Sequence, residues 1–270
     1  MNTYIELHIR SVTHAFRDII MAKLADAGYD GFLEEEEELK AYINKLQFDP
    51  DRIDDLQKEF PFSFIINEIR EENWNAIWES SFEPVLVDRF VAIRAEFHNV
   101  VENVEHEIII TPKMSFGTGH HATTFLMILE MADHNWHSKT VLDFGTGTGV
   151  LAILADKLGA AEILAIDNDP WCIENGRENM GRNNVKNMSI LLAGEIPPRR
   201  YYDIILANIN KHILLANASI LMESLNNDGI LIMSGLLTED LADIKQAYKN
   251  LGEPLNTREK NNWLLISFMK

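Results

Sequence analysis

The fold of this chain is decided by the stretch VLDFGTGTGV, residues 141–150. An apolar strand runs into a glycine-rich turn, and the turn opens a helical stretch that begins near Val150. Gly145 permits a sharp turn, while Gly147 and Gly149 let a ligand approach bare backbone at the start of the helix. This succession predicts a cofactor-binding unit in an α/β sheet.

The spacing of the glycines separates two kinds of cofactor site. A dinucleotide site carries G-x-G-x-x-G, with the pyrophosphate on the helix N-terminus. Here the spacing is G-x-G-x-G, and Val150 takes the place of the third glycine. Asp143 stands two residues before Gly145, where it would repel a pyrophosphate but suit a ligand that carries an ammonium group. A turn without a ligand and a dinucleotide site of unusual spacing are the alternatives.

Short apolar strands alternate with helices from residue 112 to the end of the chain. The alternation predicts a mainly parallel sheet with helices on both faces, followed by an antiparallel hairpin that turns at Asn261 and Asn262. The expected strands cover 140–144, 162–166, 188–192, 202–207, 229–233, 254–259 and 263–269, and the expected helices cover 123–131, 149–158, 170–183, 211–225 and 239–251.

The first 70 residues predict a separate, smaller α+β domain. Ile5, Leu7 and Ile9 alternate with polar residues as in a half-buried strand. Helices over 12–27 and 51–59, with strands near residues 32–33, 42–43 and 62–69, complete a ferredoxin-like β-α-β-β-α-β pattern. Residues 71–111 are expected to form a linker with one helix at 71–80 and short strands at 85–93 and 108–110. The domains are therefore 1–70, 71–111 and 112–270.

Two polar side chains follow later strands of the predicted sheet. Asp167 ends the second strand, 22 residues after Gly145, where an acid can accept hydrogen bonds from both ribose hydroxyls of a nucleoside. Asp169 precedes Pro170 and is expected to cap the next helix. Asn208 ends the fourth strand, where its side-chain oxygen could orient a substrate amine; a simple turn amide is the alternative.

A second glycine turn, FGTGHHATT at residues 116–124, precedes the first in the chain. The turn at 145–149 with its preceding acid resembles the first motif of class I S-adenosylmethionine (SAM) methyltransferases. The 116–124 loop, Asn208 and the text WNAIWESSFEP at 74–84 resemble the ribosomal protein L11 methyltransferase (PrmA) family. The resemblance covers about residues 70–270, and residues 1–70 match only in size and pattern.

The resemblance implies a class I methyltransferase domain that follows a small substrate-recognition domain. It also implies transfer of methyl groups from SAM to lysine side chains and the N-terminal α-amine of the large-subunit ribosomal protein L11. Asn208 would orient the substrate amine, and no residue stands out as a general base. No metal is expected, because the adjacent His120 and His121 lack further ligands. The expected cofactor contacts are Phe116, Thr118, Gly119, Thr124, Asp143, Gly145, Gly147, Asp167 and Asn208.

The charge and cysteine content limit the kinds of binding partner and the cellular compartment that we expect for this protein. The 270 residues carry 24 basic and 42 acidic side chains, a net charge of −18, which argues against broad nucleic-acid contact or an anionic membrane. Residues 1–100 hold 21 of the acids but only 10 of the bases, so a basic substrate protein suits this part. For the glutamates at 34–38 a solvated edge is the favoured interpretation, and a surface that meets a basic substrate is the alternative. The single Cys172 and the absence of a signal peptide or apolar span predict a cytoplasmic protein, which we expect to be a monomer.

Several other functions are compatible with these patterns. A SAM-dependent methyltransferase could act on another protein, on a small-molecule amine or on RNA, although the negative charge disfavours RNA. A non-catalytic SAM-binding module would bind SAM without transferring a methyl group. An NAD-linked dehydrogenase is a further alternative, and the glycine spacing disfavours it.

Overall fold

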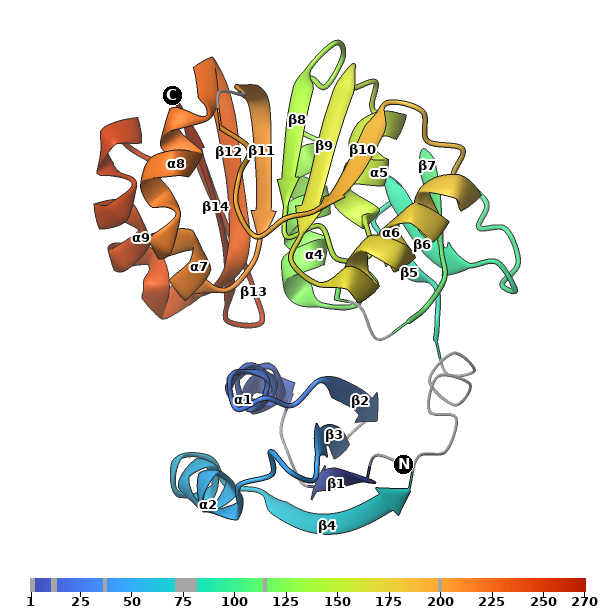
Figure 1. Cartoon of the computed structure of the whole chain (residues 1–270), viewed down its shortest axis with the longest axis vertical. Coiled ribbons are helices and arrows are strands. Elements are labelled where there is room, and N and C mark those ends of the chain that lie inside the picture. Colours follow the sequence, from blue (N-terminus) through green and yellow to red (C-terminus); the bar gives the residue numbers. More distant parts are fainter. Residues whose placement is uncertain (1–2, 11–13, 36–37, 71–81, 114–115, 199–200) are drawn as a thin grey trace. The chain divides into compact units, whose positions relative to one another are not determined.

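The computed structural model describes residues 3–10, 14–35, 38–70, 82–113, 116–198 and 201–270 (Figure 1). The chain divides into two compact units, Met1–Ser81 and Phe82–Lys270. The linker helix expected at 71–80 lies outside the described residues. Each unit has its own hydrophobic core, so the two are treated separately below.

The first unit is an antiparallel four-stranded sheet with two helices. Its sheet order is β2-β3-β1-β4, and β1 pairs with β3 on one side and β4 on the other. Ile5, Leu7 and Ile9 of β1 point into the core with Ile20 and Ile53 of the two helices, as the alternation predicted. The elements are β1 (Thr3–Arg10), α1 (His14–Asp26), β2 (Gly31–Glu35), β3 (Glu38–Asn44), α2 (Pro50–Glu59) and β4 (Ser63–Arg70).

A small three-stranded sheet opens the second unit. β5 (Val85–Val87) pairs antiparallel with β6 (Val91–Ala95), and β6 pairs parallel with β7 (His106–Ile110). The sequence placed these strands in a linker, whereas in the structure they belong to the same compact unit as the main sheet. One edge of β7 is occupied by β6, and its other edge faces α6, as described below.

The main sheet has seven strands in the order β10-β9-β8-β11-β12-β14-β13. The first five are parallel, and β14 runs antiparallel to both of its neighbours, which confirms the predicted hairpin. The order reverses between β8 and β11, so the crevice for a ligand lies at the carboxyl ends of these strands. The strands are β8 (Thr140–Phe144), β9 (Glu162–Asp167), β10 (Met188–Leu192), β11 (Tyr202–Asn208), β12 (Leu225–Leu237), β13 (Asn256–Lys260) and β14 (Trp263–Met269).

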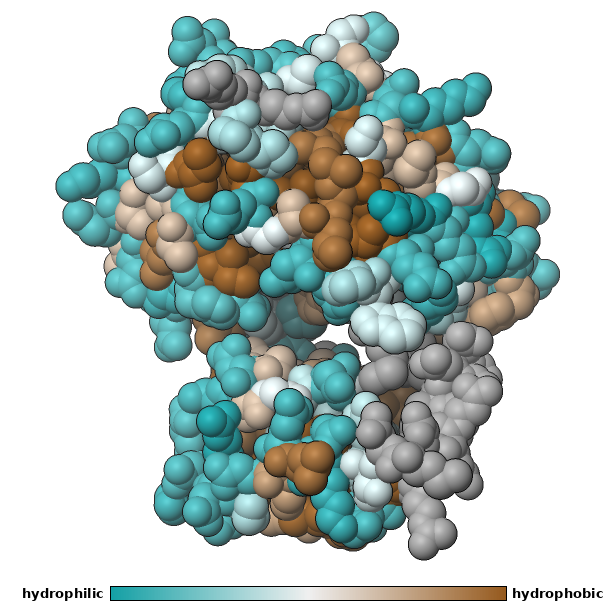
Figure 2. All heavy atoms as spheres, viewed as in Figure 1, coloured by the Kyte–Doolittle hydropathy of each residue, from teal (hydrophilic) through white to brown (hydrophobic). Residues whose placement is uncertain are grey.

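Helices cover both faces of this sheet (Figure 1). On one face Leu142, Leu164, Ile205 and Met233 pack against the helices that follow β11 and β12, which supply Tyr248 among others. Three helices contact the strands from the other face, namely α4 (Ala122–Met131), α5 (Val150–Lys157) and α6 (Pro170–Arg182). Figure 2 shows that hydrophobic residues also reach the surface over the middle of this unit, between α6 and α7, and that the margins are mostly hydrophilic.

The structure corrects three element boundaries. The strand expected at 229–233 extends over Leu225–Leu237 in β12. The helix expected at 211–225 divides into α7 (Lys211–Ala216) and α8 (Ala218–Glu223) at Asn217, whose side chain donates to the carbonyl of Ile213 and competes with the helical backbone. The helix expected at 239–251 is reduced to α9 (Leu241–Ala247) between two 3₁₀ turns, η1 (Thr238–Asp240) and η2 (Lys249–Leu251).

A buried carboxylate ties α4 to the C-terminal hairpin. Glu130 is 1% exposed and accepts hydrogen bonds from Arg258, Asn256 and Ser267. Burial alone would raise the pKa of Glu130, but these bonds and one from His134 outweigh it and hold the pKa at about 2. The ionised carboxylate is therefore part of the folded state.

We expect Glu130→Gln to lower the free energy of unfolding by about 2–4 kcal/mol at pH 7, because it leaves the Arg258 guanidinium and other donors without their charged acceptor. The folded pKa lies below the ordinary value of 4.5, so the contribution is complete above pH 4.5 and is lost as the pH falls towards 2. Urea unfolding at several pH values measures this. Glu253→Gln, at an exposed ion pair, should change stability by less than about 0.5 kcal/mol. An equal effect of both variants at pH 7 would contradict the prediction.

Candidate functional site

The loop between β8 and α5 has a backbone that only glycine adopts without strain. Gly145, Gly147 and Gly149 have φ of 79°, 53° and 81°. A Cβ atom at Gly147 would collide with the carbonyl oxygen of Phe116, and one at Gly145 would collide with the side chain of Ile209. The glycines therefore let Phe116 and Ile209 pack directly on the loop backbone at the N-terminus of α5.

Asp143 lies directly before this loop and is 1% exposed. Its Oδ2 accepts a hydrogen bond of 2.6 Å from the hydroxyl of Thr146. Burial raises the pKa of Asp143 to about 7, the hydrogen bond from Thr146 opposes the rise, and the negative charge of Asp167 adds to it. A cation bound nearby would favour the ionised form of this carboxyl.

Asp167 connects the end of β9 to the glycine loop. Its Oδ2 accepts from the backbone N–H of Gly147 at 2.9 Å, and its Oδ1 accepts from that of Asp169 at 3.0 Å. Asp169 in turn accepts from Trp171 N–H and caps α6, which confirms the prediction for this residue. Trp171 is 75% exposed beside Asp167 and Asp169, and sequence reasoning did not single it out.

The loop at 116–124 is bonded to the glycine loop through one threonine. The backbone N–H of Thr148 donates to Phe116 O at 3.0 Å, and the Thr148 hydroxyl donates to Gly117 O at 2.7 Å. The ring of Phe116 remains 53% exposed. Thr118 and Gly119 have other neighbours, since the Thr118 hydroxyl bonds to His120 and Gly119 packs closely on Ile93 of β6.

Asn208 lies at the end of β11 and is 9% exposed. Its Nδ2 donates to the hydroxyl of Thr124 on α4 at 3.3 Å. Its Oδ1 is buried and accepts no hydrogen bond from any residue that the structure describes. A buried amide oxygen without a donor costs free energy, and a bound donor such as an amine would satisfy it.

Aromatic side chains surround the start of α4. His121 caps this helix through Nδ1, which accepts from the backbone N–H of Thr123. The ring centroid of His121 lies 5.2 Å from that of Phe116 and 4.6 Å from that of Trp263. Burial lowers the pKa of His121 to about 4, so the ring is neutral at pH 7. Trp263 was not predicted, because it lies far away in sequence and reaches this place through its pairing with Leu237 of β12.

The structure brings Asp143, Asp167 and Phe116 together at the glycine loop, and it joins Asn208 to Thr124. Thr118 and Gly119 contact neither group directly, since their contacts are with His120 and Ile93. Within the described ranges, no group of three or more His, Cys, Asp or Glu side chains could hold a metal ion. Among all the residues that the structure describes, no helix is long and apolar enough to cross a membrane.

Comparison with known proteins identifies the family to which this chain belongs. The family model described as "Ribosomal protein L11 methyltransferase (PrmA)" matches residues 13–270. The chain belongs to the PrmA family. Two curated relatives carry the name ribosomal protein L11 methyltransferase. The one from Phocaeicola vulgatus is 35% identical and covers 97% of this chain and 98% of its own, and the one from Porphyromonas gingivalis is 38% identical with 93% and 90% covered.

A solved structure extends the PrmA comparison to the fold. The ribosomal protein L11 methylase from Lactobacillus delbrueckii subsp. bulgaricus has a TM-score of 0.64 and 30% sequence identity, and the match covers 70% of this chain and 98% of that one. The second unit of this PrmA-family protein is thus a class I methyltransferase domain, as the resemblance implied. The glycine loop follows the carboxyl end of β8, and Asp167 and Asn208 lie at the carboxyl ends of β9 and β11.

Proposed function

We propose that this protein transfers methyl groups from SAM to lysine side chains and the N-terminal α-amine of ribosomal protein L11. Membership of the PrmA family and the names of its relatives support this activity. The single structural observation that carries the chemistry is the buried Oδ1 of Asn208, which lacks a donor in the described structure and ends the strand beside the glycine loop. An amine is the donor that this oxygen would bind.

The residues present fit SAM. The glycine loop lies at the N-terminus of α5, and its glycines let Ile209 and Phe116 pack directly on the loop backbone. The buried Oδ1 atoms of Asp143 and Asn208 accept no hydrogen bond from the described residues, so a cationic ligand and an amine would satisfy them. We propose that Asp167 binds the ribose hydroxyls and that the Asp143 carboxylate stabilises the positive charge of the ligand. Phe116, Thr118, Gly119 and Thr124 would form the remaining contacts. The exposed Trp171 beside Asp167 is a further candidate to cover the adenine.

In the proposed reaction, the lone pair of a neutral amine would form a bond to the methyl carbon as the carbon–sulfur bond breaks, and S-adenosylhomocysteine would leave with that electron pair. SAM supplies an activated methyl group on a sulfonium, so the protein mainly aligns and desolvates the reactants. Asn208 Oδ1 accepts an N–H of the amine and directs its lone pair at the methyl group. Thr124 fixes the Asn208 amide through the 3.3 Å hydrogen bond.

The amine must lose a proton before it attacks. For a lysine with a pKa near 10.4 this costs about 4.6 kcal/mol at pH 7, against about 1 kcal/mol for an α-amine. His121 is a poor base, because its pKa is about 4 and its Nδ1 is already bonded to Thr123. We therefore assign no general base, and we propose that desolvation in the crevice lowers the pKa of the amine.

The test is transfer of a radiolabelled methyl group from SAM to a mixture of free ribosomal proteins. We expect label on L11 lysines and on its N-terminus, read by mass spectrometry of the separated proteins. Label on RNA alone, on another protein, or on nothing would contradict the proposal. Calorimetry with SAM and NAD in parallel separates a SAM-binding protein from a dehydrogenase.

We also propose that residues 1–70 recognise the substrate protein. The support is the excess of acidic side chains in this part of the chain. The glutamates at 34–38 contribute less free charge than their number suggests, because Glu38 contacts His8 and Arg10, and Glu34 lies 3.7 Å from Arg17. The protein would act in the cytoplasm, without broad nucleic-acid contact, and its monomeric state stays a prediction.

Raised salt should weaken the binding of L11 more than the binding of SAM. Surface charges of opposite sign attract less as the ionic strength rises, whereas a small ligand in a crevice is screened less. We expect KM for L11 to rise about tenfold between 50 and 300 mM salt, and KM for SAM to change less than about twofold. Initial rates at several salt concentrations measure both. Equal changes in the two constants would contradict recognition by charge.

A further inference from the structure

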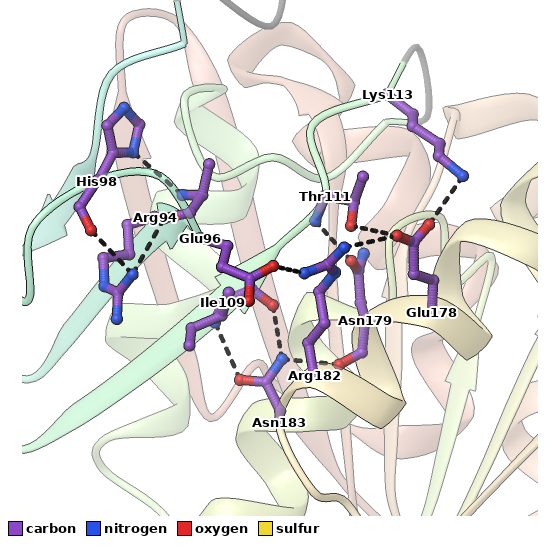
Figure 3. A network of polar contacts seen from close by, with 11 residues as sticks. Arg94, Glu96, His98, Ile109, Thr111, Lys113, Glu178, Asn179, Arg182 and Asn183 are labelled. Carbon is purple, nitrogen blue, oxygen red and sulfur yellow. Dashed lines mark hydrogen bonds and ion pairs between the residues drawn. The ribbon is translucent and has the colours of Figure 1, made fainter.

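Three asparagines lie one helical turn apart, Asn175 and Asn179 on α6 and Asn183 as its C-cap residue, and all three bond to the backbone at the end of β7. Asn183 accepts from the backbone N–H of Ile109 at 2.9 Å and donates to its carbonyl at 2.6 Å. Asn179 accepts from the N–H of Thr111 at 2.7 Å, and Asn175 donates to the Thr111 carbonyl at 3.2 Å. Figure 3 shows the contacts of Asn179 and Asn183.

This asparagine ladder (Asn175, Asn179 and Asn183) takes the place of a neighbouring strand. Four helical residues rise about 6 Å, and two strand residues rise about 6.6 Å, so the two repeats nearly match. Ile109 and Thr111 are alternate residues, and their backbone groups point to the edge of β7 that β6 does not occupy. Asn175 and Asn179 are fully buried, so their hydrogen bonds are shielded from water.

Asn179 makes one contact that the other two asparagines do not make. Its Nδ2 donates to the carbonyl of Thr148 at 2.9 Å. Thr148 belongs to the glycine loop, and it donates in turn to the carbonyls of Phe116 and Gly117. The Asn179 amide therefore links Thr111 to the glycine loop at Thr148. Thr148 in turn links the glycine loop to Phe116 and Gly117.

A second group holds the same segment from the surface. Glu178 accepts from the Thr111 hydroxyl at 2.8 Å, from Lys113 Nζ at 2.8 Å and from Arg182 at 2.9 Å (Figure 3). The hydrogen bond from Lys113 is the largest cause that lowers the pKa of Glu178 to about 2. The segment that leads into the 116–124 loop is thus held by α6 on its buried side and on its exposed side.

We propose that Asn179 is a positioning residue for the cofactor: it sets the place of Thr148, and through it the place of Phe116 and Gly117 over the glycine loop, and so controls the affinity for SAM without touching SAM. This inference rests on the proposed function, because it requires SAM to bind in the glycine loop. The buried amide satisfies a donor of one segment and an acceptor of the other, and it does so with a neutral side chain.

The experiment compares Asn179→Leu with Asn183→Leu in the full chain. Both variants lose two hydrogen bonds to backbone groups of other segments, but only Asn179 reaches the glycine loop. We expect Asn179→Leu to raise the Kd for SAM about tenfold, and Asn183→Leu to keep it within about twofold of the original. At saturating SAM, kcat should fall less than about threefold, since the reacting groups are unchanged.

Amide hydrogen exchange, measured without SAM, distinguishes a local effect from a general loss of stability. A general loss would raise exchange rates throughout the second unit, whereas the proposed role affects the 116–121 segment. Exchange in a peptide that contains residues 116–121 should quicken in Asn179→Leu but not in Asn183→Leu. If Asn179→Leu does not fold, Glu178→Gln decides, with an expected rise of about threefold in the Kd for SAM.

The outcomes separate the two proposals. A parent protein that binds SAM, together with equal Kd values for both leucine variants, overturns the role of Asn179 and leaves the methyltransferase proposal intact. A parent protein that does not bind SAM overturns the proposed function and this inference with it.

Discussion

Asn208→Ala should lower kcat for methyl transfer about 100-fold and change the Kd for SAM less than about threefold. The variant removes a buried amide oxygen that accepts no hydrogen bond from the described residues. Without it the amine still enters the crevice, but its lone pair is no longer held in line with the methyl group, and misorientation of this kind costs about 10²-fold. Single-turnover rates at saturating SAM and L11 measure the effect.

Two further variants test whether the Asn208 oxygen acts by orientation. Thr124→Val removes the hydroxyl that fixes the amide, so kcat should fall by about tenfold, less than in Asn208→Ala. Asn217→Ala also removes an amide, but on the connection between α7 and α8, and should leave kcat unchanged. Full turnover by Asn208→Ala at saturating substrates would show that the amine is oriented by another group.

The conformation of the glycine loop and the places of its acids could be predicted because they depend on local sequence. Gly145, Gly147 and Asp143 lie within five consecutive residues. A turn with positive φ favours glycine at positions 145 and 147, so the glycine spacing alone indicates the backbone conformation. The alternating strands were also predictable, because burial on a sheet imposes a short period on the sequence. Asp167 followed from topology, since consecutive parallel strands bring their carboxyl ends to one edge.

The contacts between distant segments could not be predicted. Asn175, Asn179 and Asn183 look like the polar face of an amphipathic helix, and nothing in their spacing indicates that two of them are fully buried against Thr111. The asparagines bond to backbone groups of Ile109 and Thr111, and every residue type except proline offers the same backbone groups. The identity of the residues at β7 therefore does not indicate these contacts.

The strands of the small sheet were expected at 85–93 and 108–110, but their division and pairing were not. β5 has only three residues, so the sequence showed no period that would separate it from β6. β5 pairs with β6, which follows it closely in the chain. β7 pairs with β6 in parallel, and the sequence between the two strands does not indicate this pairing. The division of the chain at Ser81 therefore emerges from contacts, whereas sequence reasoning placed a linker up to residue 111.

Gly147→Ala should raise the Kd for SAM about 100-fold. The residue has φ of 53°, and a Cβ atom there would collide with the backbone carbonyl of Phe116, which no side-chain rotation can relieve. The glycine loop and the 116–124 loop must then separate, which breaks the hydrogen bonds of Thr148 to Phe116 and Gly117 and displaces the N–H of Gly147 from Asp167. Losing several of these contacts at about 1 kcal/mol each accounts for a change of this size.

Gly181→Ala is the matched control, because it adds the same methyl group in the same unit of the chain. Gly181 lies in α6, and a Cβ atom there meets no atom within 4 Å. Alanine should stabilise that helix by about 0.5–1 kcal/mol and leave the Kd for SAM unchanged. Calorimetry with SAM measures both constants, and thermal unfolding identifies any loss of fold. If Gly147→Ala bound SAM as tightly as Gly181→Ala, the close approach of the two loops would not govern the cofactor site.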